Sequence, residues 1–205
     1  MNDPDNSILY SQIKMIELSG PWILGYALDI HTLKSEYTGE DQYGRPVFNT
    51  LRSKIGQCIY NLKYVQQFSE IEKIMDILLS VNEFKNYMEK MDIILPAIPT
   101  NKNRQLQPVI LIAQEIARVF SKEMRQDIFI SSNYEEIKNF DAKEKYKRIR
   151  DNLSIECRLE KNKNILLFDD VFDSGSTLTA MTNIMLENGY KNIFVFTLTK
   201  TRITN

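Results

Sequence analysis

The chain has 205 residues, 43% hydrophobic and 26% charged, a balance that is ordinary for a globular protein with a buried core. Its formal net charge of −1 excludes a global field that would attract nucleic acid or an anionic membrane, so any anionic ligand must be held by local groups. The length suits one α/β domain with an elaboration, or two small domains.

The two cysteines and the N-terminus indicate the compartment. Cys58 and Cys157 lie outside any CxxC or Cys/His cluster, which argues against a structural zinc site. Two thiols in a chain of this size are typical of a reduced protein, although a disulfide between them stays open. The N-terminus is polar and acidic, and no apolar run approaches the ~20 residues that span a bilayer. We therefore expect a cytoplasmic protein without a membrane segment.

The first 49 residues differ in texture from the rest of the chain. Trp22–Ile30 alternates large apolar side chains with smaller or polar ones, which predicts a β-strand. Ser35–Phe48 carries two glycines and a proline among polar residues, which predicts a turn-rich loop. We interpret residues 1–49 as a β-containing extension or hood, and residues 50–205 as the main domain.

Helical and strand patterns alternate in the main domain. Apolar residues recur at helical spacing over 55–65 and 71–79, and Pro108 suits the first turn of a helix that continues to Phe120. Asp92–Ile98 and Asp127–Ile130 are typical of short buried strands.

The last third of the domain begins with a polar segment, Ser131–Lys163, in which Asp141–Arg150 suits a solvated helix. A third buried strand follows at Ile165–Phe168, then an amphipathic helix that Gly189 is placed to cap, and a fourth strand at Ile193–Leu198.

These four strands predict an α/β fold with a doubly wound, mainly parallel sheet covered by helices on both faces. Right-handed crossovers limit the topology, and we expect the third strand to lie beside the first, with the second and fourth strands flanking them. Strand order then reverses between the first and third strands, and ligands bind at the carboxyl ends of strands at such a point. We therefore expect a site built from the loops Pro96–Gln105 and Asp169–Thr177.

The segment Ile165–Thr177, ILLFDDVFDSGST, leads from a buried strand through a polar loop into a helix. The free N–H groups and positive dipole end of that helix can hold a phosphate dianion. Gly175 permits close backbone approach. Hydroxyl donors come from three more residues, Ser174, Ser176 and Thr177. An ordinary capped turn is the alternative for the loop taken alone.

Asp169 and Asp170 stand directly before this loop and directly after the apolar run. Two carboxylates at a strand end suit the vicinal hydroxyls of a sugar or a bound magnesium ion. A solvated turn is the alternative, which the preceding apolar strand weakens.

Together these residues resemble the phosphoribosyl pyrophosphate (PRPP) motif of type I phosphoribosyltransferases, with Phe172 bulkier than the usual aliphatic residue. The pieces QCIYNLKY, DIILPAIP, RIRDN and VFTLTKTR are similar to the competence-associated, ComF-like branch of that family. The resemblance covers Thr50–Arg202. The cysteine cluster of that branch does not occur in residues 1–49.

The resemblance implies an enzyme that binds Mg²⁺-PRPP and transfers ribose 5-phosphate to a small nitrogenous acceptor, releasing pyrophosphate. Asp169 and Asp170 would hold the ribose hydroxyls and, through them or through water, the metal. Asp173–Thr177 would hold the 5′-phosphate. Asp173 would also face the acceptor and handle its proton, which makes it the catalytic candidate.

The resemblance also implies a pyrophosphate site in the loop after the first strand. Backbone groups of Ala97 and Ile98 would contribute, together with the charges of Lys102 and Arg104. Solvated loop charge is the alternative for the two cations.

A mobile flap would occupy Ser131–Lys163 and close over the substrate. Its candidate cations, each of which could equally be solvated, are Lys145, Lys147, Arg148 and Arg150.

The hood would choose the acceptor. Its aromatic residues could stack on a base, but core or dimer contacts are the favoured interpretation for Trp22, Tyr26, Tyr37 and Tyr43. We expect the sole histidine, His31, to be a surface or hydrogen-bonded residue rather than a catalyst.

Two other functions stay open. One is a catalytically silent regulator that senses PRPP or a nucleotide, and the other is a ComF-like accessory protein for DNA uptake. Binding to nucleic acid or membranes is not expected, and a homodimer is left open.

Overall fold

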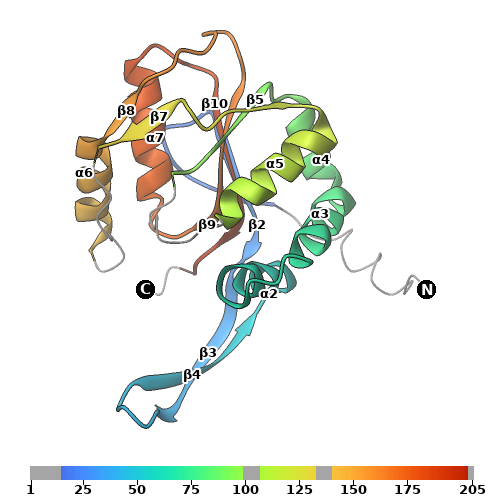
Figure 1. Ribbon diagram of the computed structural model, residues 1–205, viewed down its shortest axis with the longest axis vertical. Coiled ribbons are helices and arrows are strands. Elements are labelled where there is room, and N and C mark those ends of the chain that lie inside the picture. Colours follow the sequence, from blue (N-terminus) through green and yellow to red (C-terminus); the bar gives the residue numbers. More distant parts are fainter. Residues whose placement is uncertain (1–14, 99–106, 133–139, 203–205) are drawn as a thin grey trace.

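The computed structural model describes residues 15–98, 107–132 and 140–202. Its main sheet has six strands in the order β1-β2-β10-β9-β5-β6 (Figure 1). All neighbours in this sheet run parallel except β1 and β2. The strands are β1 (Ile16–Glu17), β2 (Leu24–Ile30), β5 (Ile93–Pro96), β6 (Glu123–Met124), β9 (Ile165–Phe172) and β10 (Ile193–Lys200).

The strands bury side chains on both faces of the sheet. In β9, Leu166 and Phe168 pack into one apolar cluster, while Ile165 and Leu167 pack into another on the opposite face. α7 (Ser176–Glu187) contributes to the second cluster. The first is covered by α2 (Lys54–Tyr60), η1 (Asn61–Val65), α3 (Glu70–Ser80), α4 (Asn82–Glu89) and α5 (Pro108–Phe120). The predicted doubly wound, mainly parallel α/β fold is therefore confirmed.

Strand order follows the prediction in the centre of the sheet and departs from it at one edge. The third predicted strand, β9, lies beside the first, β5, and the fourth, β10, flanks β9, as expected. Part of Asp127–Ile130 is a strand as expected, but its expected place beside the central strands of the main sheet is wrong. That segment leads into β7 (Phe129–Ser131), which pairs antiparallel with β8 (Leu153–Ile155) in a separate sheet.

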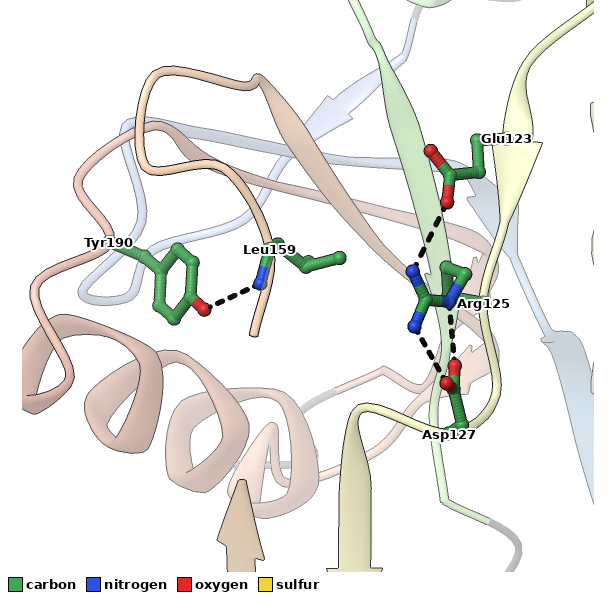
Figure 2. Close-up of polar contacts among 5 residues, drawn as sticks. All are labelled: Glu123, Arg125, Asp127, Leu159 and Tyr190. Atoms are coloured by element: carbon green, nitrogen blue, oxygen red, sulfur yellow. Dashed lines mark hydrogen bonds and ion pairs between the residues drawn. The ribbon is translucent and has the colours of Figure 1, made fainter. Parts of the chain in front are cut away.

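The short strand β6 takes the edge position instead. It pairs with β5 over two residues, and the Arg125 backbone N–H then donates to the Ile94 carbonyl. Figure 2 shows the Arg125 guanidinium between the carboxylates of Glu123 and Asp127. This side-chain clamp lies where the chain leaves the sheet edge after β6.

The N-terminal residues contribute to both the sheet and a projecting arm. β2 pairs parallel with β10, so part of the predicted extension lies within the main sheet. The turn-rich loop expected over Ser35–Phe48 is wrong, because β3 (Thr32–Glu40) and β4 (Pro46–Arg52) form an antiparallel hairpin that projects from the body (Figure 1). The Asp41 carboxylate closes its turn by accepting from the N–H groups of Tyr43 and Arg45.

Helix ends follow their local chemistry. Pro108 opens α5 as expected, and Gly189 follows α7 with a φ of +82°. Asp141 caps α6 (Ala142–Asn152) by accepting from the Glu144 N–H, and α6 packs against α7. Within the described ranges, no helix has the length and apolar character needed to cross a membrane.

Candidate functional site

The loop between β9 and α7 is compact. Gly175 is the N-cap of α7 and has a φ of +74°, a conformation that favours glycine. The hydroxyl oxygens of Ser174 and Ser176 lie 2.8 Å apart, and Ser176 also donates to the Ala142 carbonyl at 2.8 Å. The loop thus places hydroxyls at the positive end of a helix of 12 residues.

A hollow of about 210 Å³ opens at this loop. It is lined by Asp169–Leu178 together with Lys63, Lys145 and Ile149. The acid pair and the loop predicted to hold the 5′-phosphate, Asp173–Thr177, therefore share one cavity at the carboxyl end of β9. We call Asp173–Thr177 the phosphate loop. Two cations from distant parts of the chain lie in the same cavity.

The acid pair is set into the protein rather than solvated. Asp170 is only 6% exposed, and its backbone N–H donates to the Asp169 carboxylate at 2.8 Å. Burial, followed by repulsion from the Asp170 carboxylate, raises the pKa of Asp169 above its ordinary value. Lys63 Nζ donates to Asp170 Oδ1 at 2.7 Å. Lys63 is not among the site residues expected from the sequence.

The two carboxylates fit a magnesium ion that keeps much of its own hydration. Mg²⁺ prefers oxygen ligands and is commonly held by one or two carboxylates together with substrate phosphates and water. Asp169 and Asp170 supply such oxygens. Across the described residues, no three or more His, Cys, Asp or Glu side chains gather into a metal-binding group. A fully protein-built cage is thus not the arrangement that these residues offer.

Asp173 lies at the rim of the hollow, with its side chain 63% exposed. Its carboxylate accepts from Lys145 Nζ at 3.3 Å and from the Thr201 hydroxyl at 3.2 Å. The contact with Lys145 joins α6, from the predicted flap segment, to the phosphate loop. Whether Asp173 faces an acceptor stays a prediction.

Two other flap cations have partners outside the lining of the hollow. Arg148 pairs with Glu144 and stacks over the Phe140 ring at 4.0 Å, while Arg150 pairs with Glu187 on α7. Of the four candidates, the hollow is lined by Lys145 alone.

The segment predicted to bind pyrophosphate is described only in part. The Ala97 N–H donates to the Phe168 carbonyl at 2.7 Å, which places Ala97 beside the residue before Asp169. Ala97 and Ile98 line a second cavity of about 80 Å³ rather than the hollow at the phosphate loop. Lys102 and Arg104 lie outside the described residues.

Arg125 lines this second cavity, and its clamp gives a pH prediction. Hydrogen bonding from Arg125 lowers the pKa of Asp127 to about 2 (Figure 2). Because this pKa lies below that of the unfolded chain, about 3.9, the pair stabilises the fold above that pH. The contribution is lost as the pH falls toward 2. We expect thermal unfolding between pH 5 and 2 to depend less on pH in Asp127→Asn. An identical dependence in both proteins would contradict the assignment.

The predicted hood aromatics fall into two groups. Trp22 is buried and meets Phe172 edge to face at 6.2 Å, and Tyr26 meets Tyr87 at 5.3 Å. Tyr37 and Tyr43 are exposed on the hairpin. Trp22 thus supports the residue that precedes the phosphate loop, in keeping with the favoured core interpretation for this side chain.

His31 is partly buried, and its Nδ1 lies 3.0 Å from the Thr199 hydroxyl. Burial, followed by the charges of Lys63 and Arg52, lowers its pKa. This contact agrees with the expectation of a hydrogen-bonded residue.

Comparisons with known proteins give structural neighbours only. No protein-family model and no curated protein matches the chain. An adenine phosphoribosyltransferase aligns over 80% of this chain and 85% of its own, with 15% identity and a TM-score of 0.43. Orotate phosphoribosyltransferase from Aeropyrum pernix aligns over 81% and 74%, with 12% identity and a TM-score of 0.42.

A third neighbour is adenine phosphoribosyltransferase from Saccharomyces cerevisiae, complexed with an imino-altritol bisphosphate and adenine. It aligns over 80% of this chain and 83% of its own, with 13% identity and a TM-score of 0.40. Similarity at this level assigns no activity, so the function is argued from the hollow and its residues.

Proposed function

We propose that this chain binds Mg²⁺-PRPP and transfers its ribose 5-phosphate group to a nitrogenous acceptor, with release of pyrophosphate. The observation that supports this most is the hollow at the end of β9, which joins two acids to a hydroxyl-rich helix N-terminus. A phosphate dianion and a pair of sugar hydroxyls are the ligands that such a surface recognises.

In this proposal, different residues bind different parts of PRPP. The hydroxyls of Ser174 and Ser176 and the first N–H groups of α7 hold the 5′-phosphate. Asp169 and Asp170 accept hydrogen bonds from the ribose hydroxyls. A Mg²⁺ ion held by the same two acids, through the ribose hydroxyls or water, would supply positive charge for the pyrophosphate group. Asp173 gives up its contact with Lys145, contacts the acceptor instead, and takes the acceptor's proton.

Calorimetric titration with PRPP and Mg²⁺ tests the proposal. We expect the wild-type chain to bind, and the double variant Asp169→Asn, Asp170→Asn to lose about 100-fold or more in affinity, because two charge-assisted hydrogen bonds are lost. Asp76→Asn, an exposed substitution on α3, should bind like the wild type. Equal affinity in the double variant, or no binding by the wild type, would contradict the proposal.

A PRPP-sensing regulator is the second candidate. It is favoured by the contacts that tie α6 to the phosphate loop, Lys145 to Asp173 and Ser176 to Ala142. A helix that rests on the ligand loop could report whether the ligand is bound. A pyrophosphate-release assay over bases, amines and ammonia separates the two candidates. Release indicates transfer, whereas tight binding without release indicates sensing.

A third candidate is an accessory role in DNA uptake, which follows from the resemblance to the ComF-like branch. It requires a contiguous basic face with exposed aromatic residues. The hairpin offers exposed aromatics, Tyr37, Tyr43 and Phe48, but the net charge of the chain is −1. Binding to single-stranded DNA at low salt would favour this role.

The oligomeric state is a separate question. Sedimentation equilibrium would decide whether the chain forms a homodimer.

A further inference from the structure

Lys63 lines the hollow although it is far from the acid pair in the sequence. It lies 107 positions before Asp170, yet its ammonium donates to the Asp170 carboxylate at 2.7 Å. The two side chains are only 20% and 8% exposed. Both therefore lose hydration in the folded chain, and the ion pair offsets part of that loss.

The charge of Lys63 acts on both acids of the pair. Asp169 directly precedes Asp170 in β9 and lines the same hollow as Lys63. The ammonium therefore lies beside two adjacent acids, whose carboxylates repel each other when both are ionised. A single cation at this place offsets the repulsion and permits both acids to accept hydrogen bonds from a ligand.

Lys63 lies on a π-helical turn, η1, from which its side chain extends to Asp170. α2 passes directly into η1, and π turns of this kind are frequent at functional sites. Gln66 ends η1 with a φ of +57°, and the Gln67 N–H donates to the Asn61 carbonyl at 3.2 Å. These contacts close the turn immediately after Lys63.

A buried carboxylate fixes the start of the same turn. Glu70 is 2% exposed and accepts from Lys73 at 2.8 Å and from the Asn61 side chain at 3.4 Å. Asn61 is the first residue of η1. The turn that carries Lys63 is therefore held at both ends, which indicates that the direction of its side chain is set by the fold.

We propose that Lys63 is a positioning residue for the sugar of PRPP, whose ammonium holds the Asp170 carboxylate as a fixed acceptor for the ribose hydroxyls. The inference rests on the proposed function and adds a residue from η1 to its site. It requires that Lys63 act through Asp170 rather than through a separate contact with the substrate.

A double-mutant cycle tests this requirement. The four proteins are wild type, Lys63→Met, Asp170→Asn and the double variant, titrated by calorimetry with PRPP and Mg²⁺. We expect Lys63→Met to weaken binding by about tenfold or more, as loss of a supporting partner commonly does. The double variant should bind no more weakly than Asp170→Asn alone. Lys63→Arg should recover part of the affinity, and Lys34→Met, an exposed cation on the hairpin, should change nothing.

The outcomes separate the inference from the proposed function. If Lys63→Met binds like the wild type, or if the two single losses add in the double variant, the inference is wrong while the function stands. If the wild type binds no PRPP, the proposed function fails, and the role of Lys63 within it fails too. Thermal unfolding of each variant identifies misfolding, and if Lys63→Met does not fold, Lys63→Gln compared with Lys63→Arg decides the same point.

Discussion

Replacing Gly175 with alanine is expected to lower the free energy of unfolding and to disable the phosphate loop. Its φ of +74° costs an L-residue about 1–2 kcal/mol. A Cβ at this position would also lie 2.5 Å from Phe172 Cζ, so the loop or the ring must shift. Because a misplacement of about 1 Å can cost about 100-fold in rate, we expect pyrophosphate release to fall on that order.

Gly189 offers a matched control at the other end of α7. It has a similar φ of +82°, but the nearest atom to an added Cβ is Lys161 Nζ at 3.9 Å. Gly189→Ala should therefore lose stability through backbone strain and keep its affinity for PRPP. Adding Phe172→Leu to Gly175→Ala should recover part of the lost activity. Equal PRPP affinity in Gly175→Ala and Gly189→Ala would show that the loop does not hold the ligand.

The elements that could be predicted from the sequence are those in which the residues of the element itself show a pattern of burial. β5, β9 and β10 are apolar runs, and α5 and α7 carry apolar stripes, so each element is recognisable without its neighbours. The β3–β4 hairpin is not recognisable in this way. Most of its side chains are exposed, and its pairing is set by cross-strand partners such as Tyr37 and Phe48.

The same distinction applies to the site. The acids and the phosphate loop are contiguous in sequence, so their chemistry could be recognised before their geometry was known. Lys63 lies on a π turn, where the α-helical period does not predict the direction of a side chain. Lys145 is one of four candidate cations, and Ile149, one α-helical turn further along α6, lines the hollow with it. Only the tertiary structure shows that Lys145, and not Arg148 or Arg150, lines the hollow.

Phe84→Ala is expected to cause the largest loss of stability among these variants. Phe84 is fully buried on α4, with its ring 4.7 Å from that of Phe196 in β10 and 5.6 Å from that of Phe120 in α5. Removing a buried phenylalanine ring costs about 3–5 kcal/mol, because transfer energy is lost and a cavity remains. For a chain of this size, that loss corresponds to a Tm lower by roughly 6–20 °C.

Thermal unfolding measures this loss, and Phe68→Ala is its control, because Phe68 is 45% exposed and should change the Tm by far less. The site should respond differently from the core. None of the residues that line the hollow is Phe84 or one of its ring partners, so the folded fraction of Phe84→Ala should keep wild-type affinity for PRPP. A loss of affinity at temperatures where the variant is folded would instead indicate that the aromatic cluster holds β9. Phe168, which stacks on Phe196 at 6.4 Å and directly precedes Asp169, is the residue through which that coupling would pass.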